Sequence, residues 1–232
     1  MHILLTRPLE DCNEMILKFQ SLGHKVSHMP LIIIEGKKYE NINFNNYNGI
    51  IFTSSNSIKY LNIKKIDKKI NCFCVGMATE KKAKNVGFQN VFSADGNVNN
   101  LKELILRNVN SAEGKLIYIS GEIISIDLDK DLIAEGYNIK RVINYIAKPV
   151  EKLDDEFIKN LKLKMPEIVY VYSQNSAINF LNLIKNYHLD KLWMNTNLMC
   201  IGEKTSVILN EIKWRKIFLF NPGEEEFLLY KI

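Results

Sequence analysis

The chain lacks the features by which several large protein classes are identified. No apolar run approaches the ~20 residues that a transmembrane helix needs, and the first residues form neither the charged nor the apolar segment of a signal peptide. The Gly-x-Gly-x-x-Gly fingerprint of dinucleotide-binding folds and the glycine-rich phosphate loop are also missing. We therefore expect a cytoplasmic protein with no membrane partner and no nucleotide cofactor.

The four cysteines and four histidines show neither metal-ligand spacing nor a disulfide framework. Cys72 and Cys74 alternate on a predicted strand, so both side chains should lie on one face as small core residues. The histidines form no cluster with cysteines or carboxylates, which argues against a metal centre and against a nucleophile with an adjacent base. We expect no metal and no cofactor.

The composition is that of an ordinary globular protein with a slight excess of positive charge. Of the 232 residues, 47% are hydrophobic and 25% are charged, which leaves apolar material for a core in each of two domains. The formal net charge of +5 is small and scattered along the chain. It suits an anionic small molecule and does not indicate a nucleic-acid partner.

Short apolar segments alternate with helical patterns along most of the chain. The predicted strands span residues 3–5, 25–29, 50–52, 72–75, 116–119, 142–146, 168–172, 198–201 and 217–220. The predicted helices include residues 9–22, 79–86, 126–134 and 176–187. This alternation is typical of α/β proteins with buried parallel sheets.

A strand-to-turn-to-helix motif occurs twice with matching residues. The first copy has Ser54, Asn56 and Ser57, followed by Cys74, Gly76 and Thr79. The second copy has Ser173, Asn175 and Ser176, followed by Cys200, Gly202 and Thr205. Such a repeat predicts two similar domains that face each other across a shared cleft.

The predicted seams between these domains lie at residues 35–40 and 147–152, where extended apolar segments pass into charged residues. The first seam follows only two predicted strands, which are too few for a domain. We therefore expect a discontinuous domain of residues 1–35 and 149–232, with residues 36–148 forming an inserted domain. Because the seams are narrow and charged, we also expect the orientation of the domains to vary.

Ligands of open α/β sheets bind at the carboxyl ends of strands, where loops lead into helices. Both Ser-x-Asn-Ser turns lie at such places. Ser57 and Ser176 are the predicted N-caps, and the free amides behind them would form an anion site. A purely structural role in helix capping is the alternative, and the recurrence of the turn with a paired Gly-x-x-Thr makes that alternative the weaker one.

Other polar groups follow predicted strands. Arg7 comes after the first strand and would project toward the cleft, although a surface arginine without a role explains it equally well. Ser120 and Gly121 follow another strand. Tyr145 lies near a strand end close to the second seam, where the alternative is a packed aromatic with a satisfied hydroxyl.

Taken in order, these motifs resemble the uroporphyrinogen-III synthase family. The similar segments are Leu5-Thr6-Arg7-Pro8, Phe52-Thr53-Ser54-Ser55-Asn56, Val75-Gly76-x-x-Thr79, Ser120-Gly121, Tyr145 before Pro149, Tyr172-Ser173 and Ile201-Gly202-x-x-Thr205. They span nearly the whole chain. The resemblance implies two flavodoxin-like, doubly wound parallel-sheet domains that are joined by a two-stranded linker, with the active site in the cleft between them.

The resemblance also implies an activity. It would make the chain a cofactor-independent hydro-lyase of tetrapyrrole and heme biosynthesis (EC 4.2.1.75), which cyclises linear hydroxymethylbilane with loss of water and inversion of ring D. The product would be uroporphyrinogen III. The only partner implied is this small polycarboxylate substrate, so we expect a monomer.

By the same resemblance, Tyr145 is the catalytic acid that assists departure of the substrate hydroxyl, because a phenol is protonated at neutral pH. The substrate-binding residues that we expect are Arg7, Ser54, Ser55, Asn56, Thr79, Ser120, Gly121, Ser173, Gln174 and Thr205. One departure from the family stands out. Many members carry a basic residue soon after the glycine that matches Gly121, where this chain has Glu122, so we expect Lys115 or Lys130 to compensate.

Two rival functions remain open at this point. A two-domain cytoplasmic binding protein that closes on an anionic polycarboxylate without converting it would have the same cleft. A nucleotide-sugar transferase would need a diphosphate-binding loop, which the sequence does not contain.

Overall fold

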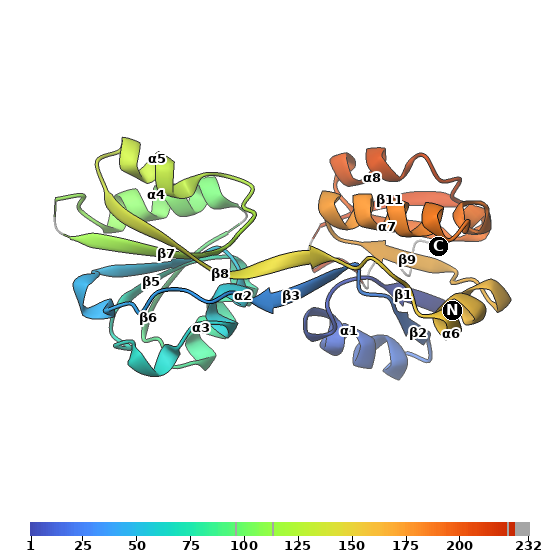
Figure 1. Cartoon of the computed structure of the whole chain (residues 1–232), viewed down its shortest axis with the longest axis horizontal. Helices are drawn as coiled ribbons and strands as arrows, with labels where there is room; N and C mark the ends of the chain where they lie inside the picture. The colour runs from blue at the N-terminus through green and yellow to red at the C-terminus, as the bar shows by residue number, and fades with distance from the viewer. Residues whose placement is uncertain (96, 113, 222, 226–232) are drawn as a thin grey trace. The chain divides into compact units, whose positions relative to one another are not determined.

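The computed structural model of this chain describes residues 1–95, 97–112, 114–221 and 223–225 (Figure 1). It is an α/β structure, as the sequence predicts, and it divides into two compact units. The first unit comprises Met1–Ile33 and Lys148–Ile232, and the second comprises Ile34–Ala147. Among the described residues, no helix is both long enough and apolar enough to cross a membrane.

The first unit is built on a five-stranded parallel sheet. Its strands, in spatial order, are β11 (Lys216–Phe220), β10 (Asn197–Ile201), β9 (Ile168–Val171), β1 (His2–Leu5) and β2 (Lys25–His28). Read from the other edge in chain order, this is the 2-1-3-4-5 arrangement of flavodoxin-like folds. The strand order therefore reverses between β1 and β9.

Helices cover both faces of this sheet, because alternate residues of each buried strand point to opposite sides. The helices are α1 (Leu9–Ser21), α6 (Asp155–Leu163), α7 (Gln174–Asn186) and α8 (Glu203–Leu209), with a 3-10 helix at Asp190–Asn195. Ile3 and Leu5 pack with Phe19 of α1 on one face. Leu4 and Val169 pack with α7 on the other.

The second unit contains a six-stranded sheet. Its strands, in spatial order, are β3 (Ile32–Gly36), β8 (Asn138–Pro149), β7 (Lys115–Gly121), β4 (Gly49–Phe52), β5 (Asn71–Val75) and β6 (Asn90–Ala94). From β8 to β6 every neighbouring pair is parallel. β3 runs antiparallel to β8, because Lys37 N–H bonds the Asn144 carbonyl while Val150 N–H bonds the Leu31 carbonyl. The chain passes between the units along these two paired strands.

The second sheet is also covered on both faces (Figure 1). α2 (Ser55–Lys59) and α3 (Gly76–Asn85) lie on one face, and α4 (Val98–Asn108) and α5 (Leu128–Ala134) lie on the other. Two 3-10 helices, Phe44–Asn46 and Ile63–Lys65, complete the unit. Ile50 and Phe52 pack on the α2 side and Ile51 on the α4 side, which is the doubly wound arrangement that the sequence predicts.

Each predicted strand is present, and Cys72 and Cys74 lie on one buried face with their sulfur atoms 3.7 Å apart. Two strands were not predicted: β3, which lies at the first seam, and β6, whose alternating polar residues hide its apolar positions. The strand predicted at 142–146 in fact spans Asn138–Pro149, because its charged ends face solvent and break the apolar pattern. The helix predicted at 79–86 begins three residues earlier, at Gly76.

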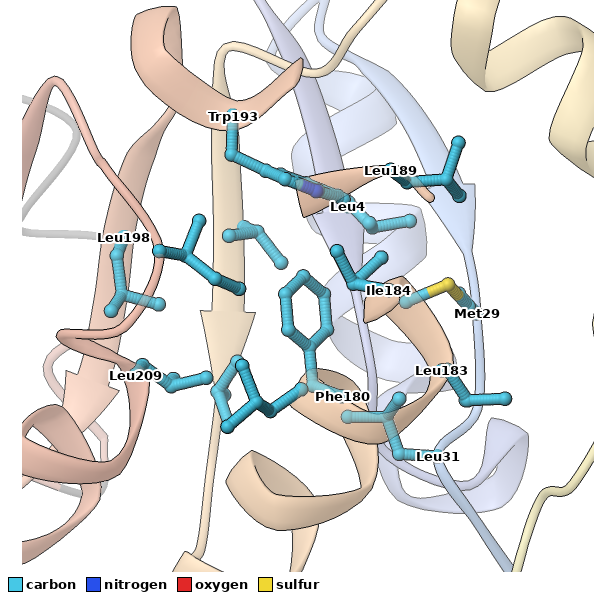
Figure 2. Packing of buried hydrophobic residues seen from close by; sticks show 14 of the residues in the cluster. Leu4, Met29, Leu31, Phe180, Leu183, Ile184, Leu189, Trp193, Leu198 and Leu209 are labelled. Atoms are coloured by element: carbon cyan, nitrogen blue, oxygen red, sulfur yellow. The ribbon is translucent and has the colours of Figure 1, made fainter. Parts of the chain in front are cut away.

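The core of the first unit generates a stability prediction (Figure 2). Phe180 is fully buried, with its ring centroid 4.9 Å from that of Trp193 and 5.9 Å from that of Trp214. We expect Phe180→Ala to lower the free energy of unfolding by about 3–5 kcal/mol, through lost burial and the cavity left behind. Urea denaturation followed by tryptophan fluorescence measures this directly, because both tryptophans of the chain lie in this core.

The matched control is Ile178→Ala on the same helix, where the side chain is 47% exposed. We expect this substitution to change stability by less than about 1 kcal/mol. Equal losses for the two variants would contradict the packing described for Phe180.

Candidate functional site

In the first unit, the candidate residues gather at the carboxyl ends of β1 and β9. β1 leads into α1 on one face of the sheet, while β9 leads into α7 on the opposite face. The two connections therefore depart in opposite directions at this point, and such a reversal of strand order is where ligands of open α/β sheets bind. Thr6, Arg7 and Ser173 all follow these two strands.

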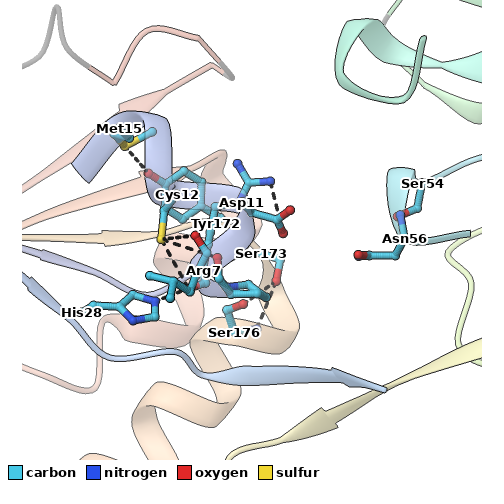
Figure 3. Close-up of polar contacts among 12 residues, drawn as sticks. Arg7, Asp11, Cys12, Met15, His28, Ser54, Asn56, Tyr172, Ser173 and Ser176 are labelled. Carbon is cyan, nitrogen blue, oxygen red and sulfur yellow. Dashed lines mark hydrogen bonds and ion pairs between the residues drawn. The ribbon is translucent and has the colours of Figure 1, made fainter. Parts of the chain in front are cut away.

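Arg7, which follows β1, is held by the ring of Tyr172 and the carboxylate of Asp11 (Figure 3). Its guanidinium carbon lies 5.1 Å from the centroid of the Tyr172 ring, and its Nη2 atom lies 3.7 Å from the Asp11 carboxylate. The His28 imidazole lies 2.7 Å from the Arg7 carbonyl oxygen through Nε2, which therefore carries the proton. The Arg7 side chain remains 38% exposed, so it is fixed in position and still open to an anion.

The neighbours of Arg7 are not reactive groups. Burial raises the pKa of the Tyr172 phenol far above its ordinary value, the Glu225 carboxylate raises it further, and Arg7 opposes the change. Tyr172 therefore stays neutral, and its hydroxyl donates a hydrogen bond to the Met15 sulfur at 3.2 Å. Burial also raises the pKa of the Cys12 thiol to about 11, so this cysteine is not a thiolate nucleophile at neutral pH.

The first serine of each repeated turn caps the following helix, and the prediction that Ser57 and Ser176 are the N-caps is wrong. Ser173 accepts the Ser176 N–H at 3.1 Å at the start of α7, and Ser54 accepts the Asn56 N–H at 3.2 Å at the start of α2. Each strand ends so close to its turn that the helix begins at the residue after this first serine. Ser57 is instead fully buried inside α2.

In the second unit, the corresponding reversal of strand order lies between β4 and β7. β4 leads into α2 on one face of the sheet and β7 leads toward α5 on the other. Ser54, Ser55 and Asn56 follow β4 and are half-buried. Beside them, the Thr53 hydroxyl lies 2.9 Å from the Tyr118 hydroxyl, and burial raises the pKa of that phenol, so it remains protonated.

Tyr145 lies directly against Gly121 because of an irregularity in strand pairing. The register pairs Ser120 with Ile143 but Gly121 with Tyr145, so Asn144 is an extra residue on β8, as in a β-bulge. A Cβ atom on Gly121 would lie 2.7 Å from the Tyr145 ring carbon Cζ and 2.9 Å from its hydroxyl oxygen. Only a glycine permits this approach.

Ser120 is placed differently from the other predicted binding residues. Its side chain is 0% exposed, and its hydroxyl donates to the Gly121 carbonyl at 3.0 Å while it accepts the Arg141 Nε–H at 2.8 Å. The Ser120 hydroxyl therefore makes its hydrogen bonds to the adjacent residue and to Arg141.

Gly76 and Gly202 occupy equivalent positions after β5 and β10. Both have positive φ angles, +73° and +71°, and at Gly202 the ψ angle of 162° falls in a region that is essentially restricted to glycine. Each glycine turns the chain into a helix that carries a threonine three residues later. Thr79 and Thr205 are 4% and 3% exposed, at the carboxyl edges of their sheets.

Each unit thus brings its predicted residues to the carboxyl edge of its own sheet. In the first unit these residues are Arg7, Ser173, Gln174 and Thr205. In the second they are Ser54, Ser55, Asn56, Thr79, Ser120, Gly121 and Tyr145. Within the described ranges, no group of three or more histidine, cysteine, aspartate or glutamate side chains could hold a metal ion.

The basic side chain that contacts residues 120–122 is Arg141, which the sequence analysis did not single out. Lys115 cannot compensate for a missing loop base, because it opens the strand that Gly121 closes, ~20 Å away at the usual ~3.3 Å rise per residue. Lys130 lies 2.7 Å from Asp127, and this contact lowers the pKa of the Asp127 carboxyl. The sequence offers one clue to Arg141, which is its place four residues before Tyr145 on the same strand.

Two shallow hollows, of about 290 and 260 Å³, also occur in the second unit. Their walls include Asn48 and Asn71 in one and Tyr39 and Asn62 in the other. The first lies at the amino ends of β4 and β5, the opposite edge from the candidate residues, and neither hollow contains any of them. We therefore locate the site by strand topology and not by concavity.

The corrected caps can be tested by stability. We expect Ser54→Ala to lower the free energy of unfolding by about 1 kcal/mol, because an N-cap hydrogen bond is lost. Ser57→Ala is the control: its hydroxyl is buried without a partner among the described residues, so removing it should be neutral or stabilising. Urea denaturation followed by circular dichroism compares the two, and a greater loss for Ser57→Ala would restore the original prediction.

Comparisons with known proteins agree with one another. A family model described as Uroporphyrinogen-III synthase HemD matches residues 13–219. The structure of uroporphyrinogen-III synthetase from Helicobacter pylori 26695 is 18% identical, with a TM-score of 0.65, and the match covers 100% of this chain and 99% of that one. A mutant uroporphyrinogen III synthase from Thermus thermophilus is 13% identical, with a TM-score of 0.55 and coverage of 100% and 97%. These two structures show a shared fold. A search of curated proteins gave no match.

Proposed function

We propose that this chain, which belongs to the uroporphyrinogen-III synthase family, cyclises linear hydroxymethylbilane to uroporphyrinogen III. The observation that carries the proposal is the family match over residues 13–219, which covers all of the second unit and most of the first. The reaction is that of a lyase in tetrapyrrole and heme biosynthesis. No observation favours the alternative of a binding protein without catalysis.

The chemistry requires positioning more than reactive groups. The hydroxyl of the hydroxymethyl group takes up one proton and leaves as water, and the ring A nitrogen releases its N–H proton, which gives an electrophilic azafulvene on ring A. The substituted carbon of ring D attacks it, and the resulting spiro intermediate fragments and recloses with ring D inverted. The unassisted reaction closes the bilane without inversion, so the enzyme must hold one conformation of its substrate.

Tyr145 is the acid in this proposal. Its phenol lies against the Cα atom of Gly121 at the carboxyl edge of the second sheet, on a strand that also pairs with β7. A half-buried phenol in this place can donate a proton to a departing hydroxyl. Gly121 supports it by leaving room for the ring, and Ser120 supports it by holding the loop.

The remaining residues bind the substrate. Arg7 presents an exposed guanidinium to a substrate carboxylate. The first amides of the 13-residue helix α7, beside Ser173 and Gln174, add partial positive charge for another carboxylate. Ser54, Ser55 and Asn56 offer donors at β4, and the hydroxyls of Thr79 and Thr205 lie one turn inside their helices.

We further propose that the chain forms two domains, residues 1–35 with 149–232 and residues 36–148. On this proposal the enzyme acts as a cytoplasmic monomer on a small tetrapyrrole polycarboxylate. The compactness of each unit and the passage of the chain along only two strands support the division.

Product analysis tests the activity. We expect the protein to convert freshly prepared hydroxymethylbilane to uroporphyrinogen III faster than the spontaneous reaction, which gives the type I isomer. Chromatographic separation of the isomers measures both products, with heat-denatured protein as the control. Type I product alone, formed at the spontaneous rate, would overturn the proposal.

The role of Tyr145 predicts a graded set of losses. We expect Tyr145→Phe to slow turnover at saturating substrate by about 10²-fold, the typical effect of losing a positioned acid. Thr79→Ala and Thr205→Ala should each cost less, because positioning is shared among many donors. Initial rates, with circular dichroism as the test of folding, measure the series.

Tyr137→Phe is the matched control, since it removes a phenol that bonds the Val109 carbonyl at 2.7 Å just before β8 begins, away from the site. This variant should turn over normally. A folded Tyr145→Phe variant with the wild-type rate would remove Tyr145 from the mechanism.

A further inference from the structure

One arginine side chain holds all three residues of the segment 120–122, which closes β7 and begins the loop after it. Arg141, half-buried on β8, donates from Nε to the Ser120 hydroxyl at 2.8 Å and from Nη2 to the Gly121 carbonyl at 2.9 Å. The same Nη2 atom donates to the Glu122 carbonyl at 3.0 Å. The guanidinium makes these three bonds from two nitrogen atoms in one fixed plane, which the single nitrogen of an ammonium group cannot reproduce.

The loop held by Arg141 is the surface against which Tyr145 rests. The Tyr145 ring lies over Gly121, and the Glu122 N–H bonds the Tyr145 carbonyl at 3.0 Å, so the loop contacts Tyr145 through both side chain and backbone. On the outer side, Lys37 Nζ pairs with the Glu122 carboxylate at 2.5 Å. The lysine and the carboxylate are 44% and 52% exposed, so this outer pair contributes little by itself.

The bulge at Asn144 makes the position of this loop sensitive to such support. The register shifts between Ser120 and Gly121 and resumes with Gly121 opposite Tyr145, followed by the Glu122 N–H bond to the Tyr145 carbonyl. The strand ladder is therefore irregular at the point where Arg141 bonds this segment. Arg141 pairs with Tyr118, two positions before the irregularity, and its side chain reaches past it to all three loop residues. It thereby fixes the loop from a regular part of the sheet.

From this geometry we propose that Arg141 is a positioning residue, which holds the loop of residues 120–122 so that Gly121 seats the Tyr145 phenol for catalysis. The inference rests on the proposed function. Arg141 is not proposed to contact the substrate, because its guanidinium N–H groups bond residues 120–122.

Arg141→Lys tests the proposal, since lysine keeps the charge and has a single nitrogen in place of the Nε and Nη2 donors. We expect kcat to fall about tenfold, as for a modest misplacement of a catalytic group, with KM within about twofold of wild type. Hydrogen exchange of the backbone amides in residues 120–124 should become about tenfold faster. The matched control is Lys140→Met, at the position just before Arg141 on the strand. It removes only an exposed ion pair with Glu40, 3.5 Å apart, so kcat and hydrogen exchange should stay as in the wild type.

A double-mutant cycle with Tyr145→Phe separates positioning from direct binding. If Arg141 acts through Tyr145, Arg141→Lys should cost less than about threefold in the Tyr145→Phe background. A raised KM, together with independent losses that multiply, would show that Arg141 binds substrate and would overturn the proposal. An unchanged kcat in folded Arg141→Lys would also overturn it.

A second variant keeps the test decisive if Arg141→Lys does not fold. Ser120→Ala removes one acceptor and leaves the arginine in place, so it should lower kcat about threefold and speed exchange in the same amides. Normal kcat and normal exchange in this variant would contradict the proposal. The exchange measurement needs no turnover, so it still tests the hold on the loop if the wild-type protein makes no uroporphyrinogen III, an outcome that would overturn the proposed function alone.

Discussion

Parallel strand pairing is the constraint on which the rest of the structure depends. Neighbouring parallel strands are joined by crossover connections, whose helices pack on the faces of the sheet. The loops at the carboxyl ends of these strands therefore all emerge at the same edge. In both units the chain uses this edge for its polar turns. The residues that the resemblance singled out, from Arg7 to Thr205, are far apart in sequence and yet fall at the carboxyl edges of only two sheets.

The regular pairing of β7 with β8 is interrupted at one point. A regular parallel pair would set Asn144 opposite Gly121, but the extra residue sets Tyr145 there instead. Asn144 then lies fully buried and donates to the Ser57 carbonyl at 2.7 Å, which ties α2 to the strand. One strand therefore supports both loops of the strand-order reversal, through Asn144 at α2 and through Tyr145 and Arg141 at the loop after β7.

Much of this fold could be predicted because buried parallel strands are continuous apolar runs, as at residues 168–171, and such runs stand out in any sequence. β6 could not be found in this way, because three of its five residues are half-buried and its polar positions interrupt the pattern. The N-caps were misplaced by three residues because serine occurs at both positions of each turn, and only the strand end decides between them. The rule for strand ends placed the candidate residues next to strands at the carboxyl edges of the sheets. It could not point to Arg141, because the contacts of Arg141 depend on how far its side chain reaches across the neighbouring strand, which the four-residue spacing to Tyr145 does not specify.

The repeat and its differences together explain why two similar sheets suit one reaction. Both sheets have the same spatial order, with β9, β10 and β11 matched by β4, β5 and β6, and with β1 and β2 matched by β7 and β8. The threonine and glycine turns are the same in both. The strands beside the reversal differ, since an exposed arginine, Arg7, comes after β1, whereas β7 ends in Gly121, which lies against the Tyr145 phenol. In the proposed reaction a polyanion must be anchored while a single hydroxyl leaves. These are separate demands on charge and on proton donation, and the duplicated strand end lets the chain meet each of them with a different residue.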